Sequence, residues 1–242
     1  MSWSGLFDGE AAVWPRSRVQ LEGLQRTLAA QWRSEPAWRP QRDRPLRIGA
    51  VFAATSRGLA GTGAAGDPAW AAAVVILEGR LEKSAVLTGR FDAPYAPGLL
   101  ALREGRLLQE AVRALGGALE VLMVNATGRD HPRGAGLAIH LGAACDVPTI
   151  GITDRPLLAT GPEPGIQRGE TAELRLGDEL VGYRLRTRVG VHAAVVHAGW
   201  RVDPDTACKL VLGVTRNSRT PEPLRQARRL ARARRSHDSV LA

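Results

Sequence analysis

Lysine and cysteine are both scarce in this chain of 242 residues. Lys83 and Lys209 are the only lysines among 33 basic Lys and Arg residues, and Cys145 and Cys208 are the only cysteines. The two cysteines lie far apart and lack the spacing of metal ligands, which argues against a disulfide framework and against a zinc site. A reducing compartment is therefore expected.

Long apolar runs are also missing. The longest run, residues 69–77, is far too short to span a bilayer. The first residues lack the charged and then apolar segments of a signal peptide. We therefore expect a cytoplasmic protein without membrane contact.

What the chain has in excess is arginine, which supplies nearly all of the basic charge behind a net charge of +9. The guanidinium fork matches phosphate oxygens, so an Arg-rich surface favours DNA or RNA as a partner. The alternative is a merely solvated surface, because net charge alone says little about function. Nothing in the sequence specifies an oligomeric state.

The stretch 121–153 predicts the central unit of the fold. It contains an apolar run at 121–124, a loop at 125–134, a small-residue helix at 135–145 and a second predicted buried strand at 149–153. This order predicts a βαβ crossover with parallel strands. Ligands of open α/β sheets bind beyond the carboxyl ends of such strands, so Asn125 and Asp154 are predicted to share one rim of the sheet.

The rest of the chain extends this unit. Further strands are predicted at residues 46–54, 69–77, 81–90, 180–187 and 191–197. Further helices are predicted at residues 19–32, 99–115, 204–212 and 224–235. We predict an α/β fold with a ribonuclease-H-like mixed sheet flanked by helices and an appended C-terminal hairpin with helices. The predicted divisions are an N-terminal helical extension and linker (1–45), the main domain (46–235) and a C-terminal tail (236–242).

Several spaced motifs resemble those of endonuclease V, a metal-dependent nuclease family that acts near deaminated bases, chiefly inosine. They are Pro94-Tyr95-Ala96-Pro97-Gly98 with Leu102-Arg103-Glu104, His131-Pro132-Arg133 with Gly136-Leu137-Ala138 and His140-Leu141-Gly142, Val147-Pro148-Thr149-Ile150-Gly151, and Arg219-Thr220-Pro221-Glu222-Pro223. The resemblance covers about residues 46–229 and implies a ribonuclease-H-like fold.

The resemblance also implies carboxylates that hold Mg²⁺ or Mn²⁺, which activates water and stabilises charge on the scissile phosphate. By the family pattern, aspartates belong at Val51 and Asn125, a lysine at Asp154 and a histidine at Trp200, so only Glu104 is kept. Valine cannot bind a cation, asparagine adds no charge, and tryptophan cannot transfer a proton. We therefore expect lost or strongly reduced nuclease activity and weak or absent Mg²⁺ binding.

Other family positions are retained. Tyr95, preceded by Pro94 in the family's rigid wedge loop, is expected to enter a duplex and separate bases. Its alternative is a surface tyrosine fixed by flanking prolines. Arg103, His131 and Arg133 are candidates for phosphate contacts, and His131 is also counted with the catalytic positions. For His131 and Arg133 the alternative is structural, with His131 closing a loop hydrogen bond.

Two glycines, Gly128 and Gly136, resemble part of the family's base-recognition pocket, where backbone groups read a flipped purine. Close packing of helix and strand is the alternative explanation, because glycine permits it too. A displaced, weaker metal site made of Glu104, Asp154 and the Asn125 carbonyl is a further hypothesis.

The leading interpretation is an endonuclease V-like protein that binds nucleic acid but lacks efficient cleavage. One alternative is an active inosine-directed endonuclease with a rearranged metal site. Another is a pocket repurposed for small-molecule binding or for non-nuclease chemistry, and Trp200 and Val51 would make such a pocket drier and more apolar. A scaffold acting only through partner contacts would need neither the pocket nor the arginine-rich helix predicted at residues 224–235.

Overall fold

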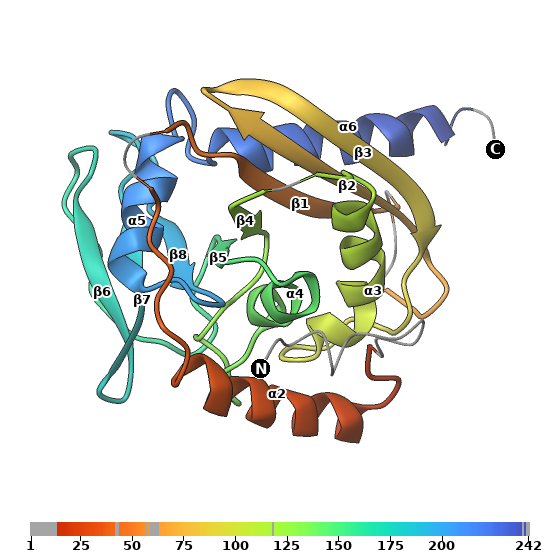
Figure 1. Cartoon of the computed structure of the whole chain (residues 1–242), viewed down its shortest axis with the longest axis horizontal. Coiled ribbons are helices and arrows are strands. Elements are labelled where there is room, and N and C mark those ends of the chain that lie inside the picture. The colour runs from red at the N-terminus through yellow and green to blue at the C-terminus, as the bar shows by residue number, and fades with distance from the viewer. Residues whose placement is uncertain are drawn as a thin grey trace.

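A computed structural model of the chain describes residues 14–41, 44–56, 58, 63–117, 119–238 and 240. An eight-stranded sheet with the order β3-β2-β1-β4-β5-β8-β7-β6 forms its centre (Figure 1). The strands are β1 (Ile48–Thr55), β2 (Pro68–Leu77), β3 (Arg80–Arg90), β4 (Val121–Val124), β5 (Thr149–Thr153), β6 (Thr171–Leu176), β7 (Glu179–Leu185) and β8 (Ala194–Ala198).

Only the middle of the sheet is parallel. β4 runs parallel to β1 on one side and to β5 on the other, and every other neighbouring pair is antiparallel. The four residues of β4 are all buried, as expected for a strand covered on both faces. The predicted βαβ crossover is confirmed, and the carboxyl ends of β4 and β5 meet at one edge.

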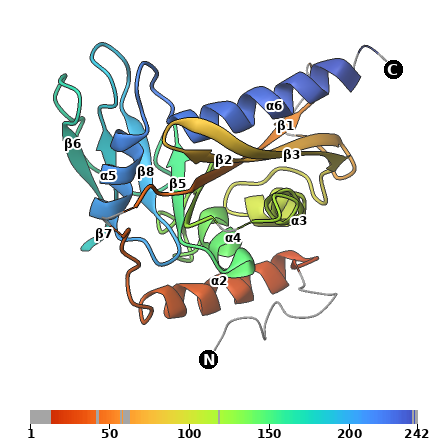
Figure 2. The same ribbon diagram turned by 45° about the horizontal axis from the view of Figure 1, so that its top comes forward.

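The helices are α2 (Arg18–Trp32), α3 (Leu100–Arg113), α4 (Leu137–Cys145), α5 (Pro204–Gly213) and α6 (Glu222–Asp238). Figure 2 shows α6 on one face of the sheet and α3 and α4 on the other, with α2 outermost on the α4 side. The alternation of β1 explains these layers, because Ala50 packs with apolar residues of α5 and α6 whereas Val51 packs with those of α3 and α4.

The sequence predicts most of these elements and misses one strand. The runs at 121–124 and 149–153 coincide with β4 and β5, and the predicted C-terminal hairpin corresponds to β7 and β8. The edge strand β6 was not predicted, although Ala172 and Leu174 alternate inward with exposed residues between them. Such an amphipathic pattern is the ordinary mark of a strand with one solvated face.

The predicted N-terminal extension is only partly described, since residues 1–13 lie outside the described residues. Its helix α2 packs on the main domain, where the indole nitrogen of Trp32 donates to the carbonyl of Gly134 at 2.9 Å. The boundary at residue 45 stays a prediction. No helix within the described part of the chain has the length and apolarity needed to cross a membrane.

Candidate nucleic-acid site at the carboxyl edge of the sheet

A small cavity opens at the edge where β4 and β5 end. Asn125 directly follows β4 and Asp154 directly follows β5, as predicted. The cavity has a volume of about 160 Å³. Its lining includes Tyr95, Gly98, Asn125, Thr127, His131 and Thr153. The structure thus brings the predicted wedge loop and the predicted rim position Asn125 to one place.

Tyr95 lies at the mouth of this cavity with 45% of its surface exposed. Its loop ends at Gly98, whose φ of +73° lies in the left-handed region that favours glycine. The Gly98 carbonyl accepts hydrogen bonds from Gln25 Nε2 at 3.2 Å and Arg133 Nη2 at 3.0 Å. The backbone that carries Tyr95 is therefore anchored while the ring remains accessible.

His131 is one of the groups that anchor this loop. Its Nδ1 accepts the backbone N–H of Arg133 at 3.2 Å, so its Nε2 carries the proton and donates to the Gly98 carbonyl at 3.1 Å. Burial is the main reason why the pKa of His131 is lowered to about 4. A neutral, 2% exposed imidazole in these bonds has the structural role that was the alternative to a phosphate contact.

Arg133 connects the same loop to the N-terminal helix. Its Nε donates to the side-chain oxygen of Gln25, and its Nη1 lies 3.4 Å from the carboxylate of Glu22. Gln25 also lines the cavity, although sequence reasoning did not select it. Its helical phase was the available signal, because Leu21, Gln25 and Leu28 fall on the buried face of α2.

Gly128 and Gly136 permit close backbone contacts beneath the cavity. A Cβ atom on Gly128 would lie 2.0 Å from the carbonyl oxygen of Ala198, and one on Gly136 would lie 2.3 Å from the carbonyl oxygen of Thr127. Close packing therefore accounts for both glycines. It also fixes the position of Thr127, which lines the cavity.

Arg103 is buried, with 3% exposure, and its donors are directed to the chain itself. Its Nη1 donates to the carbonyls of Ala93 at 2.7 Å and Ala64 at 3.1 Å, and its guanidinium lies 3.9 Å from the ring centre of Phe91. These contacts tie the start of the wedge loop to α3. They favour a structural role over the predicted phosphate contact.

Glu104, the one retained family carboxylate, lies on the same face of α3 as Ala101 and Leu108, which are buried. Burial raises the pKa of Glu104 to about 7, against the opposing effect of the Arg103 charge. Burial therefore favours the neutral, protonated form of this carboxyl group over the ionised one.

Val51 and Trp200, two of the positions that the resemblance marks as substituted, belong to the hydrophobic interior. Val51 is fully buried in β1 and packs with residues of α3 and α4. Trp200 is 1% exposed and packs with Trp32, Ile139 and neighbouring residues between α2 and α4. Neither residue is among those that line the cavity, so the predicted apolar remodelling of the pocket by these two side chains does not occur there.

Arginines engage both polar groups of the rim. Arg228 of α6 donates from Nη2 to the Oδ1 atom of Asn125 at 2.5 Å. Arg219 holds Asp154 through an ion pair of 2.7 Å, with the aspartate side chain 75% exposed. Neither arginine was selected from the sequence as a site residue of this edge.

The side-chain oxygen atoms of Asn125 and Asp154 are poorly placed to bind Mg²⁺. The oxygen of Asn125 faces a guanidinium, Asp154 is paired with another, and the described residues contain no group of three His, Cys, Asp or Glu side chains placed to hold a metal. Hard oxygen ligands with negative charge are what Mg²⁺ requires, and nearby cations repel it. The contacts of Glu104, Asp154 and Asn125 therefore do not favour the displaced metal site.

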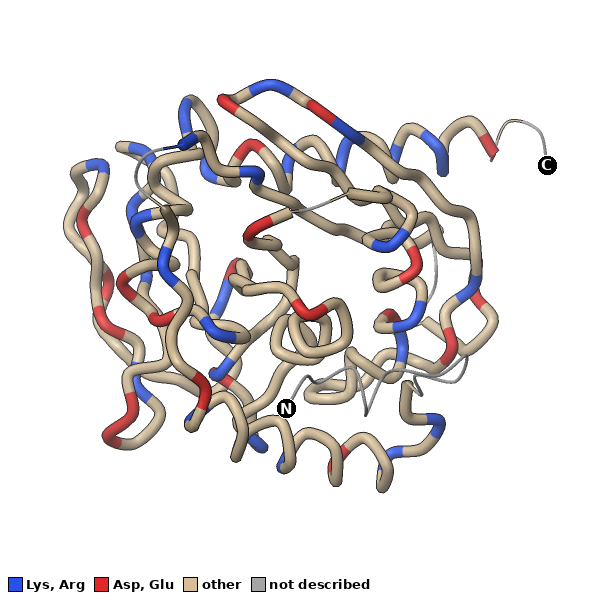
Figure 3. The backbone as a smooth tube through the Cα atoms, in the orientation of Figure 1, with Lys and Arg blue, Asp and Glu red and all other residues tan. Residues whose placement is uncertain are grey.

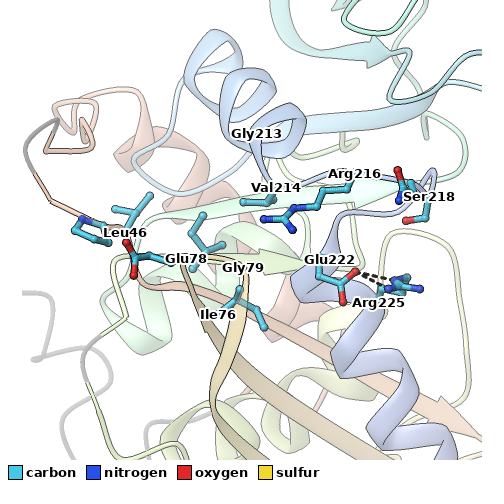
Figure 4. A pocket seen from close by; sticks show the side chains of 13 residues that line it. Leu46, Ile76, Glu78, Gly79, Gly213, Val214, Arg216, Ser218, Glu222 and Arg225 are labelled. Atoms are coloured by element: carbon cyan, nitrogen blue, oxygen red, sulfur yellow. Dashed lines mark hydrogen bonds and ion pairs between the residues drawn. The ribbon is translucent and has the colours of Figure 1, made fainter.

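A larger cavity of about 680 Å³ lies at the opposite end of the strands, near the start of β1 and the end of β2. Figure 4 shows Glu222 and Arg225 side by side at its wall, where they form an ion pair of 2.8 Å. None of the predicted site residues lines it. Of these two cavities, only the smaller one beside Tyr95 is lined by predicted site residues.

A mixed sheet with three leading antiparallel strands, parallel β1, β4 and β5, and helices on both faces defines a ribonuclease H-like protein. The family model of endonuclease V matches residues 51–229. The chain therefore belongs to the endonuclease V family, whose members are generally Mg²⁺-dependent.

Individual relatives agree with this assignment. Endonuclease V of Methanopyrus kandleri is 43% identical over 147 residues, which span 61% of this chain and 63% of that protein. The crystal structure of endonuclease V from Streptomyces avermitilis has 34% identity and a TM-score of 0.80, and the match covers 96% of this chain and 97% of the other.

A second solved structure shares the fold at 21% identity, with a TM-score of 0.73 and coverage of 90% of this chain and 97% of the other. It is Ciona intestinalis endonuclease V in complex with a 24mer DNA that contains an inosine followed by a ribo-adenosine.

Proposed function

We propose that this protein binds nucleic acid at a deaminated base through the cavity beside Tyr95, and that its metal-dependent cleavage is lost or strongly reduced. The observation that carries the proposal is a contrast between two groups of residues at the carboxyl edge of the sheet. The wedge loop is anchored and its ring is exposed, whereas Asn125 and Asp154 are engaged by arginines.

The dimensions of the cavity support a base rather than a metabolite. Its volume of about 160 Å³ is below the range of about 300–1,000 Å³ that is usual for sites of drug-sized ligands. Thr127 and Asn125 line it with polar side chains, and the Tyr95 ring at its mouth offers a surface for stacking. A flipped base is read by such a combination of stacking and hydrogen bonds.

The direct test measures binding and cleavage side by side. Fluorescent oligonucleotides with a central deoxyinosine, and matched ones with deoxyadenosine, are titrated with the protein at low salt by fluorescence polarisation. The same oligonucleotides, and an RNA version, are incubated with Mg²⁺ or Mn²⁺ and resolved on a denaturing gel. We expect tighter binding of the inosine strands and no accumulation of cut product. Cleavage that disappears in Glu104→Gln would instead establish an active, rearranged metal site.

Replacing Tyr95 with alanine is expected to weaken binding of the inosine oligonucleotide by about tenfold, since stacking on an aromatic ring contributes about 1–3 kcal/mol per base. Tyr95→Phe keeps the ring and serves as the matched control, with affinity close to that of the wild type. Because Tyr95 is 45% exposed, neither change should alter the melting temperature appreciably. Equal affinity of the alanine variant and the wild type would remove the ring from the site.

A further inference from the structure

The carboxyl edge of the sheet also carries a cluster of guanidinium groups. They come from α6 and from the segment before it. Arg228 reaches across the end of the sheet to Asn125, a residue 103 positions away along the chain. The Nη1 atom of Arg228 also points to the hydroxyl of Thr220 at 3.4 Å. The family resemblance places a metal-binding aspartate at position 125, so a protein cation now contacts the residue that would have held the metal.

Arg219 extends the cluster along the rim. Its Nη1 pairs with Asp154, and its Nη2 donates to the carbonyl of Ala193 at 2.8 Å. It also lines an open cavity of about 540 Å³ next to the edge, whereas Asn125 lines the smaller cavity that holds Tyr95. Arg228 therefore contacts a residue of the base-sized cavity, and Arg219 lines an open cavity at the same edge.

The cluster has more positive than negative charge. Arg228 and Arg232 lie 5.4 and 5.8 Å from the ring centre of Phe52, so these two guanidinium groups share one aromatic side chain. Burial is the largest cause of the lowered pKa of Arg228, Asp154 opposes it, and Arg232 and Arg219 lower it further. Three guanidinium groups thus act on the same edge against the single carboxylate of Asp154.

Donors within the cluster remain unsatisfied. Among the residues that the structure describes, the buried Nε atoms of Arg228 and Arg219 have no hydrogen-bond partner. The buried positions of α6 itself are apolar, and Leu224 and Ala227 among them pack into the core. Figure 3 shows basic positions recurring along α6 and acidic ones only near its two ends. An anion at the edge would balance the excess positive charge of this cluster.

We infer that Arg228, together with Arg219, takes the place of the divalent cation and holds a phosphate group of the bound polynucleotide without any metal. The inference rests on the proposed function and adds how the backbone is held. A guanidinium fork donates two parallel hydrogen bonds to phosphate oxygens and neutralises their charge. It cannot generate a hydroxide from bound water, as a metal ion does. Such an edge grips the backbone and leaves it intact.

The test compares wild type, Arg228→Met, Arg228→Lys and the control Arg229→Met, all in EDTA. Arg229 is the adjacent residue of the same helix, but it is exposed and its Nε donates to Gln226 within α6. Binding of the fluorescent inosine oligonucleotide is measured over a series of salt concentrations. In parallel, inorganic phosphate is added in a thermal-shift assay, which separates a free phosphate from a backbone phosphate.

We expect Arg228→Met to weaken oligonucleotide binding by about tenfold or more, because a charged hydrogen-bond donor is lost. The slope of affinity against salt should fall by about one. Arg228→Lys keeps the charge but loses the fork and should be intermediate. The affinity of Arg229→Met for the oligonucleotide should stay within about twofold of that of the wild type, because an arginine that contacts no phosphate releases no counterions on binding. Wild-type affinity should be the same in EDTA and in Mg²⁺.

Two results overturn the inference while leaving the proposed function in place: unchanged binding by Arg228→Met, or loss of wild-type binding in EDTA. If circular dichroism shows Arg228→Met unfolded, Arg228→Lys decides, and wild-type affinity of that variant overturns the inference. A further result refutes the proposed function but retains the anion site. In that case the wild type binds no oligonucleotide, and inorganic phosphate stabilises the wild type but not Arg228→Met.

Discussion

Replacing Trp200 with alanine is expected to lower the free energy of unfolding by about 3–5 kcal/mol, the usual cost of emptying a buried aromatic site. The indole is 1% exposed and fills the space between α2 and α4, and Gly142 of α4 would clash with its Cβ atom if it carried a side chain. For a chain of this size the melting temperature should fall by about 10 °C. Urea denaturation and differential scanning calorimetry measure both quantities.

Trp38 provides the matched control for this substitution. It is a partly buried tryptophan that packs on the opposite face of the sheet, so Trp38→Ala should cost clearly less. The variant Trp200→His separates stability from chemistry, because it restores the residue type of the family pattern. It should lose stability and gain no cleavage with Mn²⁺. A loss below about 1 kcal/mol for Trp200→Ala would show that the indole is not part of the core.

The identity of Trp200 illustrates which part of the site the sequence could predict. By the family resemblance, position 200 is predicted to have lost an acid–base group. It could not predict where the indole would go, because its neighbours Trp32 and Ile139 come from two distant helices. The residue at this position is here part of the packing between those helices.

The strands at the edge were predictable for a simple reason. β4 and β5 are short parallel strands covered on both faces, so β4 is an unbroken apolar run and β5 carries Ile150 and Ile152 between two threonines, which makes their ends easy to place. Asn125 and Asp154 follow directly from those ends. In contrast, β6 has a solvated face and a charged alternation, which was overlooked beside the Gly- and Pro-rich segment that precedes it.

The arginines were harder, because tertiary contacts decide their roles. The end of the chain reads as uniformly basic, yet Arg228 of α6 is the arginine that bonds to Asn125. Leu224 is buried one helical turn before it, and this spacing of four residues was the signal that could have singled out Arg228. Arg103, in contrast, was predicted to contact phosphate. Its guanidinium instead donates to two carbonyl groups and lies over the Phe91 ring inside the fold.

Replacing Glu104 with glutamine is expected to stabilise the protein at pH 8 and to leave its stability near pH 4.5 unchanged. Burial raises the pKa of Glu104 from its usual 4.5 to about 7. The folded protein therefore keeps a proton that the unfolded chain has already lost, and stability falls as the pH rises through this interval. Above pH 7 the ionised carboxylate costs at most about 3 kcal/mol, which the neutral amide of Glu104→Gln avoids.

Thermal melting of wild type and Glu104→Gln across pH 4.5 to 8 measures this effect, with Glu110→Gln as the control. Glu110 lies on the same helix but is exposed and paired with Arg106, so its loss should change little. The metal-binding alternative predicts the reverse behaviour, because a bound cation favours the ionised carboxylate and stabilises the folded state. Mn²⁺ that raises the melting temperature of the wild type at pH 8, and not that of Glu104→Gln, would therefore contradict the expected result. Arg228 and Arg219 engage Asn125 and Asp154. The described part of the chain has no cluster of acidic or imidazole groups that could bind a cation together with Glu104. We therefore expect Mn²⁺ to leave both melting curves unchanged.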